Sequence, residues 1–390
     1  MRRTAAVAVL ITALLGSAPV LAQEAGRDFQ AEVALLYRVV ACGKSDTPVP
    51  AEWTKVVDEH CREMGVQTAR FRKRFVDRAI PFLTRLRPVD APRTVVYPFG
   101  GGDLAGALVT YPEATEITTM SLEHAGDPTR LDGITPQALR RALADFRAAI
   151  RGLLALHDST SDNLQKMQRG PLPGQISFFL TALAVFDYRP VSLRYFKLEP
   201  DGSVHYYTGE EIAALATTSA GKKKVTWTAA DHSIAFSNSE LVFERAAGGE
   251  RVVHRHMAAN LDDQHFKGSP VEKHLLAKGD VVAMTKAASY LLWMNFFSGI
   301  RDYLTAHAVY MVSDSTGVPP RHARQAGLKQ VTYGKFTGPF LKASVKHQQA
   351  FIQMWNKQPF RRLGFRYGYP DMVGNFHLVI TQREAAAATP

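Results

Sequence analysis

Hydrophobic residues in the N-terminal quarter of the chain recur every three or four positions. This spacing places apolar side chains on one face of a helix, and it predicts amphipathic helices over residues 29–40, 52–64 and 68–86. Residues 43–50, rich in Gly, Ser, Asp and Pro, separate the first two helices. We therefore expect a helical N-terminal region over residues 23–90.

After residue 90 the pattern changes to short apolar runs bounded by glycine, proline and polar residues. Residues 93–99 and 115–122 are typical of buried strands, and residues 104–111 between them are typical of a helix. This order predicts two parallel strands joined by a right-handed crossover. Further strands are expected at 191–198, 204–207, 281–284, 308–312, 331–340 and 376–381, and further helices at 136–156, 175–186, 287–304 and 341–355. Ser298 and Gly299 mark a position at which the helix at 287–304 can break.

This order of elements predicts the α/β fold class, as a Rossmann-like mixed sheet within one domain over residues 91–384. Turn residues at 200–203 and 246–250 predict hairpins, so we expect an antiparallel β insertion, or lobe, near residues 188–262. Residues 385–390 are expected to form a disordered tail.

Composition and the first residues indicate the compartment. The chain has 390 residues, of which 46% are hydrophobic and 21% charged, so it is neither collagen-like, wholly disordered nor disulfide-dense. Arg2 and Arg3 precede an apolar stretch over 5–15, and a small-residue pattern ends at Ala22, which together predict a signal peptide over residues 1–22. A membrane anchor is the alternative, but the stretch is shorter than the roughly 20 residues that span a bilayer. We expect cleavage after Ala22, no transmembrane segment afterwards, and a secreted or periplasmic protein.

Cys42 and Cys61 are the two cysteines of the chain. An isolated pair in an oxidising compartment is typical of a disulfide, which would join the first two predicted helices. A metal site that includes His60 is the alternative reading. Two thiols and one imidazole lack the fourth ligand of a structural zinc site, so the sequence favours the disulfide.

His254 and His256 form an H-x-H pair on a predicted strand, a spacing that can begin a metal site. The flanking Arg251 and Arg255 disfavour a cation nearby. We therefore interpret both histidines as solvent-facing strand residues, and the sequence predicts no metal.

A glycine turn follows the first predicted strand and is the strongest local motif. Gly100, Gly101, Gly102 and Asp103 come directly before a predicted helix, and Glu123 ends the next strand about 20 positions later. In this order the segment near 93–123 resembles the nucleotide-binding start of class I S-adenosylmethionine-dependent methyltransferases. The resemblance implies that the turn and Glu123 bind a ligand at a helix N-terminus.

The same segment departs from the methyltransferase pattern. Tyr97, Pro98 and Phe99 stand where the family carries an acidic residue, and the glycines are contiguous rather than spaced. Export also separates the chain from a cofactor that is made in the cytoplasm. We therefore expect a small ligand without methyl transfer. S-adenosylmethionine or a nucleoside-like ligand is the one cofactor class that the resemblance suggests.

A second polar segment is expected to reach the same sheet edge. Asp314 and Ser315 follow the strand predicted at 308–312, and ligands collect at the carboxyl ends of strands in open α/β sheets. His124, next to Glu123, completes the set of ligand-binding candidates. An envelope-associated transferase or hydrolase is the alternative function, with Asp103, Glu123, His124 and Asp314 as its candidate residues. The chain has no G-x-S-x-G nucleophile elbow, and no catalytic residue is assigned.

Positive charge supports a third reading, that of a basic envelope interaction protein. The formal net charge is +11, and it becomes +9 when Arg2 and Arg3 leave with the signal peptide. Outside the cytoplasm such a balance favours acidic glycans or anionic lipid headgroups over nucleic acid. Basic residues cluster on the helix at 68–86, and arginines alternate with aromatic residues over 355–369. Solvated helix faces and core aromatics are the alternative interpretation of both segments.

Overall fold

The computed structural model describes most of the chain. The predicted signal peptide and the predicted tail lie outside the described residues, which are 26–154, 171–219, 233–338, 345–368 and 376–383. Among the described residues, no helix is both long and apolar enough to cross a membrane.

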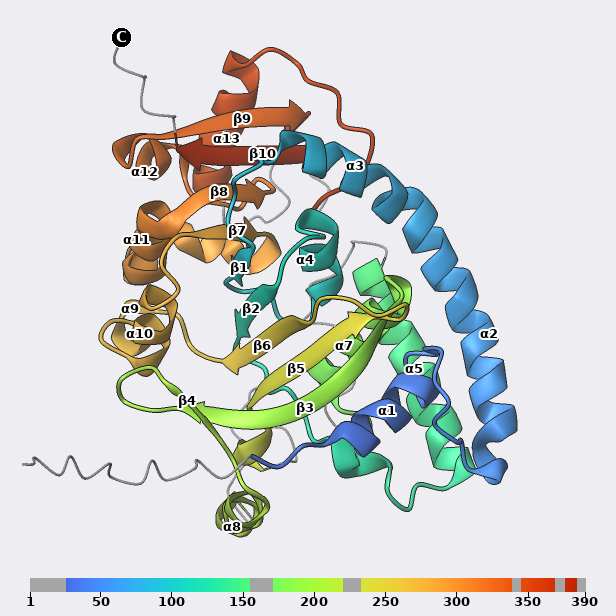
Figure 1. Cartoon of the computed structure of the whole chain (residues 1–390). Helices are drawn as coiled ribbons and strands as arrows, with labels where there is room; N and C mark the ends of the chain where they lie inside the picture. Colours follow the sequence, from blue (N-terminus) through green and yellow to red (C-terminus); the bar gives the residue numbers. More distant parts are fainter. Residues whose placement is uncertain (1–25, 155–170, 220–232, 339–344, 369–375, 384–390) are drawn as a thin grey trace, which may run out of the picture.

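One ten-stranded mixed sheet organises the molecule (Figure 1). Its spatial order is β4-β3-β5-β6-β2-β1-β7-β8-β10-β9. The strands are β1 (Thr94–Tyr97), β2 (Glu116–Ser121), β3 (Tyr188–Leu198), β4 (Val204–Tyr206), β5 (Asn238–Arg245), β6 (Val252–Ala258), β7 (Val281–Thr285), β8 (Ala308–Ser313), β9 (Leu328–Gly334) and β10 (His377–Arg383).

The five central strands, β6, β2, β1, β7 and β8, are parallel to one another. On one side, β5, β3 and β4 continue the sheet in antiparallel order. On the other side, β10 pairs antiparallel with both β8 and β9. The α/β class with a mixed sheet is therefore as the sequence predicts, and the strands of 188–262 extend the main sheet, since β6 pairs with β2.

Helices cover both faces of the sheet (Figure 1). One layer contains α1 (Gln30–Val39), α2 (Thr54–Phe71), α3 (Asp77–Leu86), α4 (Leu104–Thr110), α5 (Pro136–Leu154) and α7 (Gly174–Val185). The opposite layer contains α9 (Asp263–Phe266), α10 (Pro270–Leu276), α11 (Ser298–His307), α12 (Pro320–Gln325) and α13 (Val345–Lys357). The remaining long helix is α8 (Gly209–Ser219).

Strand periodicity divides the core between the two layers. Val95 and Val282 belong to the cluster under α1–α7, whereas Val96 and Val281 belong to the cluster under α9–α12. All four side chains are fully buried. A strand covered on both faces needs apolar side chains at every position, which explains the continuous apolar runs of the sequence.

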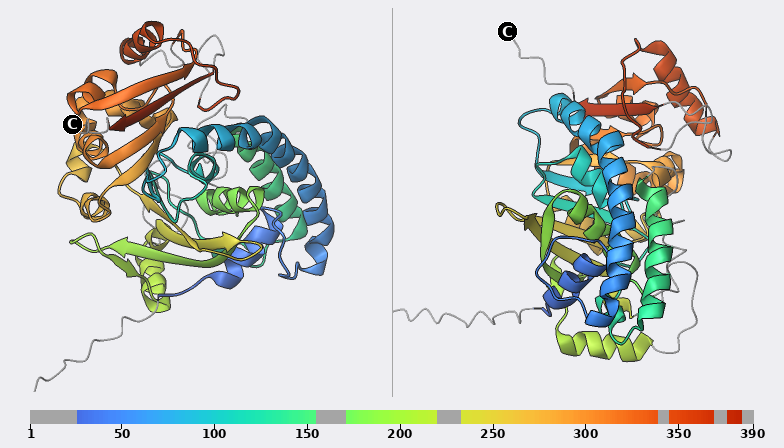
Figure 2. Two further views of the ribbon diagram at one scale, coloured as in Figure 1. Left: turned by 45° about the horizontal axis from the view of Figure 1, so that its top comes forward. Right: turned by 90° about the vertical axis from the view of Figure 1, so that its right-hand side faces the viewer.

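The second and third predicted helices form one rod. α2 passes through a π-helical turn, Arg72–Val76, directly into α3. Nothing at 65–67 stops the helix, because Gly65 is tolerated within it at a modest cost. Figure 2 shows α2 beside α5, and the ion pairs Arg140–Glu59 and Arg147–Glu63 join these two helices.

The helix predicted at 287–304 is wrong in its first half. Residues 287–297 form 3₁₀ turns, Ala287–Trp293 and Asn295–Phe297, and α11 begins at Ser298. Asp263 sets this start, because its carboxylate accepts the N–H of Gly299 at 2.7 Å. Arg301 donates to the Leu292 carbonyl at 2.9 Å and holds the 3₁₀ segment against the helix.

The strand predicted at 331–340 also has different bounds in the structure. β9 occupies Leu328–Gly334 instead of 331–340, because its polar first residues pair with β10 from Leu328 onward.

The Cys42–Cys61 disulfide is present, with the two Cα atoms 5.3 Å apart. It ties the end of α1 to the middle of α2, as expected.

Candidate functional site

The sheet changes direction at the boundary between β1 and β7. From β1 the chain continues to β2 on one side, and β7 pairs with β1 on the other. Such a topological switch point opens a crevice at the carboxyl ends of the two strands, where open α/β sheets bind ligands. The glycine turn after β1, Lys286 after β7 and Asp314 after β8 all follow strand ends at this edge.

The glycine turn is buried, and neighbouring side chains pack directly against it. Gly101 has a φ of +50°, which glycine adopts at low cost. A Cβ at Gly102 would lie 2.6 Å from the Phe178 ring, so only glycine allows α7 to approach this closely. Phe99, directly before the glycines, has a φ of +59°, a strained value for a bulky residue. Strain of this kind concentrates at functional sites.

Asp103 occupies the N-terminus of α4 itself. Its carboxylate accepts the N–H of Gly106 at 2.9 Å, as an N-cap. This side chain also forms an ion pair with Lys286, and both side chains are less than a tenth exposed. The turn therefore offers a buried carboxylate with a paired ammonium at the position where the resemblance implies a bound ligand.

Tyr97 connects this ion pair to the strand. Its hydroxyl donates to Asp103 Oδ2 at 3.1 Å. Burial raises the pKa of Tyr97 well above its ordinary value, and the negative charge of Asp103 raises it further. The phenol is therefore protonated and acts as a donor throughout the physiological range.

Asp314 brings a second buried carboxylate to the site. Asp314 Oδ1 accepts the N–H of Thr316 at 2.8 Å, which fixes a turn after β8. A Cβ on Gly368 would collide with this carboxylate, so the loop after α13 approaches Asp314 as closely as a backbone can.

Tyr367 lies next to Gly368 and completes the cluster. Its hydroxyl is 3.1 Å from Thr110 Oγ1, and its ring centroid lies 5.8 Å from Lys286 Nζ. Burial raises the pKa of Tyr367, and the charges of Asp103 and Asp314 raise it further against the opposing effect of the Thr110 hydrogen bond. We call the following set the switch-point cluster: Tyr97, Asp103, Lys286, Asp314 and Tyr367.

Two further groups lie beside the switch-point cluster. Ser315, a predicted site residue, is fully buried, and its Oγ lies 3.2 Å from His377 Nε2. Gln175 on α7 donates to Ser121 Oγ at 3.2 Å. Its buried Oε1, which faces the Gly102 turn, accepts no hydrogen bond from the part of the chain that the structure describes.

Glu123 and His124 contact a different part of the sheet edge. The carbonyl of Glu123 lies 2.8 Å from His256 Nε2, and His124 Nδ1 lies 2.6 Å from Ser237 Oγ. These contacts face β6 and the segment before β5. The structure thus joins Asp103 with Asp314 through the tyrosines, while the described contacts of Glu123 and His124 lead toward β6.

The prediction that His254 and His256 face solvent is wrong. Both are fully buried. β6 is an inner strand between β2 and β5, and α7 packs over the two histidines. Thr119 Oγ1 lies 2.9 Å from His254 Nε2 and 3.2 Å from His256 Nδ1. Burial lowers the pKa of both rings, that of His256 to about 4, so both are neutral core residues at neutral pH.

His60 lies close enough to Cys42 and Cys61 for the three to share a metal ion. The sulfurs are joined to each other, however, and a disulfide offers no thiolate ligand. His60 Nε2 contacts the Val40 carbonyl at 2.9 Å, and its Nδ1 lies 3.0 Å from Arg147. The group fits a half-buried disulfide beside a buried histidine.

Lys286, Tyr367 and His377 are absent from the sequence-based candidates. Lys286 follows an entirely apolar strand, so the rule that selects Asp314 after β8 also selects Lys286 after β7. Tyr367 and His377 carry no such signal, because a loop and an antiparallel strand bring them to the site.

Comparison of the chain with family models, with curated proteins and with solved structures finds no match. The site is therefore interpreted from its own geometry.

Proposed function

We propose that this is an exported protein that binds a small polar ligand at the switch-point cluster, without transferring a methyl group. The observation that supports the proposal is a cluster of buried charged side chains, Asp103, Lys286 and Asp314, at the carboxyl ends of β1, β7 and β8. Buried charges gathered at such an edge of the sheet are typical of functional sites.

The acceptors of the site indicate the ligand class. Asp103 and Asp314 place two carboxylates there, and Gln175 Oε1, which accepts no hydrogen bond from the described residues, adds a buried acceptor. A ligand that presents an amine, a sulfonium or another strong hydrogen-bond donor would complement both features. A phosphate group would be repelled by Asp103, which already caps α4.

Export is supported by two independent features. The first 22 residues have the order of a secretory signal, and the disulfide is of the kind that persists in oxidising compartments. The ligand is accordingly one that occurs outside the cytoplasm.

Thermal unfolding of the mature protein tests the proposal. The probes are S-adenosylmethionine, S-adenosylhomocysteine, adenosine and a series of small amines. We expect cationic probes to raise the unfolding temperature more than their neutral analogues. At 100 times its Kd, one ligand adds roughly 2.7 kcal/mol to the free energy of unfolding. D314N removes one negative charge while an amide oxygen still accepts the Thr316 N–H, so it should abolish the shift.

Asp127 provides the matched control. Its Oδ1 accepts the N–H and hydroxyl of Thr129 at 2.9 and 2.7 Å, the same motif that Asp314 forms with Thr316. D127N should leave the ligand response unchanged. A shift that is equal in wild type and D314N, or no shift with any probe, contradicts the proposal.

A further inference from the structure

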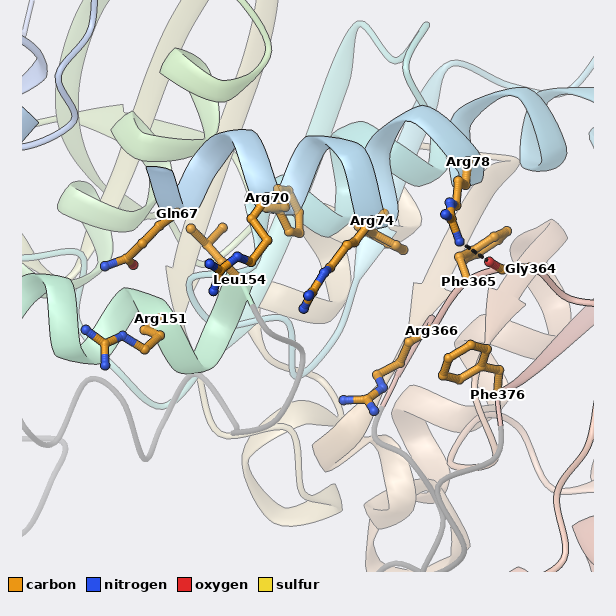
Figure 3. A pocket seen from close by; sticks show the side chains of 12 residues that line it. Gln67, Arg70, Arg74, Arg78, Arg151, Leu154, Gly364, Phe365, Arg366 and Phe376 are labelled. Carbon is orange, nitrogen blue, oxygen red and sulfur yellow. Dashed lines mark hydrogen bonds between the residues drawn. The ribbon is translucent and has the colours of Figure 1, made fainter. Parts of the chain in front are cut away.

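A second recess lies along the helical rod formed by α2, the π turn and α3. It has a volume of about 590 Å³, within the range of small-molecule sites. The end of α5 and the loop after α13 form its other walls (Figure 3). We call this recess the arginine groove.

Five arginines surround the arginine groove. Arg70, Arg74 and Arg78 are spaced four residues apart on the rod, with Arg151 on α5 and Arg366 on the loop. Figure 3 shows Arg70 and Arg74 reaching from the rod into the space that Arg366 borders from the other side. None of the described residues that line the groove is acidic. An anion is therefore the complementary ligand.

Three arginines of the groove differ from two arginines nearby on the same helices, which form ion pairs. Arg72 pairs with Asp187, and Arg147 pairs with Glu63. Within the described ranges, Arg70, Arg74 and Arg151 form no ion pair. Guanidinium groups bind phosphate through two parallel hydrogen bonds, so these three are available for such contacts.

The floor of the groove is apolar. Phe71, Phe75 and Phe365 are nearly fully buried, and Leu154 lies beside them. The ring of Phe75 lies 5.4 Å from Phe71 and 5.9 Å from Phe365, measured between centroids. Such a floor fits an aliphatic chain.

One buried hydrogen-bond acceptor also lines the groove. Gln67 Oε1 is shielded from solvent and accepts no hydrogen bond from any described residue. An unsatisfied buried carbonyl oxygen costs free energy unless a donor arrives. A ligand hydroxyl group next to the anionic group would supply that donor.

The π turn places these features together. Phe75 lies within Arg72–Val76, and Arg74 projects from the same turn. A π-helical turn widens a helix locally and is found frequently at functional sites. Burial also lowers the pKa of Arg366, which indicates a desolvated cation at the groove wall.

We propose that the arginine groove binds one molecule of an anionic phospholipid. Its phosphate would lie among the arginines, a headgroup hydroxyl would donate to Gln67 Oε1, and the acyl chains would start on the phenylalanine floor. This site shares no residue with the switch-point cluster, so the two proposals can be tested independently of each other.

Titration calorimetry with short-chain lipids below their critical micelle concentration tests the proposal. Dihexanoyl phosphatidylglycerol should bind, and added salt should weaken the binding because exposed charges are screened. R74E should weaken it by at least about tenfold, the loss expected when one charge-assisted contact is replaced by repulsion. K73E is the matched control, because Lys73 is the adjacent exposed cation and does not line the groove.

Two further probes separate the parts of the ligand. Glycerol 3-phosphate carries the anion without the chains, and dihexanoyl phosphatidylcholine carries the chains with a zwitterionic headgroup. Both should bind at least about tenfold more weakly than dihexanoyl phosphatidylglycerol. Equal binding of either probe, equal losses in R74E and K73E, or no binding of dihexanoyl phosphatidylglycerol would overturn the proposal. Circular dichroism of both variants establishes that they are folded.

Discussion

At the scale of single residues, the buried histidines determine how the protein responds to acid. His60 and His256 are almost fully buried, and burial lowers the pKa of each from 6.5 to about 4. His254 is also buried, with a pKa shifted in the same direction. In the unfolded chain each ring would recover its ordinary pKa.

We predict that the free energy of unfolding falls as the pH is lowered from about 7 to about 4. In this window the unfolded chain binds protons that the folded protein excludes, so acid favours unfolding. Above pH 7 both states hold neutral rings and the contribution is constant. One ring shifted in this way accounts for about 3 kcal/mol across the window. Urea unfolding at a series of pH values measures the slope.

H256Q retains a side-chain donor for the Glu123 carbonyl but cannot titrate, so it should reduce this slope. H265Q changes an exposed histidine and serves as the control. An unchanged slope in H256Q would refute the assignment.

Lys286 and Asp314 show which parts of the site the sequence can predict. Both follow strands whose apolar runs are evident, and the carboxyl ends of parallel strands meet at one edge. Glu123 satisfies the same rule, yet its described contact is with β6. The order of the strands within the sheet decides this contact, and the local sequence pattern does not predict that order. Tyr367 reaches the site from a loop whose path depends on packing with Gly368 against Asp314.

At the scale of elements, the Cys42–Cys61 disulfide attaches the middle of α2, and so the rod of α2 and α3, to the end of α1. The bond closes a loop of 19 residues that includes the irregular segment 43–50. This segment contributes little packing of its own, so the cross-link restricts the unfolded chain where the fold is least constrained.

We predict that the C42S/C61S double variant is less stable by about 3 kcal/mol, the value expected for a loop of this size. Urea unfolding of wild type and variant gives the difference. A reducing agent should lower the stability of wild type toward that of the variant and leave the variant unchanged. If wild type and variant unfold at the same urea concentration, the bond does not stabilise the fold.

Element boundaries follow the sequence where the periodicity is strong and fail where tertiary contacts decide. The helix at Gln30–Val39 and the strands β1, β2, β7 and β8 lie within a few residues of their predicted positions. The 3₁₀ segment after β7 is different, because its apolar residues are compatible with a helix until Asp263 and Arg301 impose another start. No local sequence pattern predicts these two tertiary contacts.

At the scale of the whole molecule, the sheet depends on an element from the end of the described chain. β10 lies between β8 and β9 and is hydrogen-bonded to both. Its residues Leu378, Val379 and Ile380 are buried and contribute to both faces of the core. In the described sheet β9 is attached through β10 alone.

We predict that truncation before Phe376 prevents stable folding of the β8–β9 edge and exposes the β8 edge to aggregation. Truncation after Arg383 keeps β10 and should leave thermal unfolding unchanged. Limited proteolysis and circular dichroism distinguish the two forms. A cooperative unfolding transition at the wild-type temperature in the shorter chain would contradict this role of β10.

The position of β10 also has a consequence in time. A ribosome makes β8 and β9 before β10, so these two strands wait without their common partner while synthesis proceeds. A chain that cannot close its sheet early remains unfolded for longer. For the export proposed above, the late pairing of β10 would favour translocation before folding.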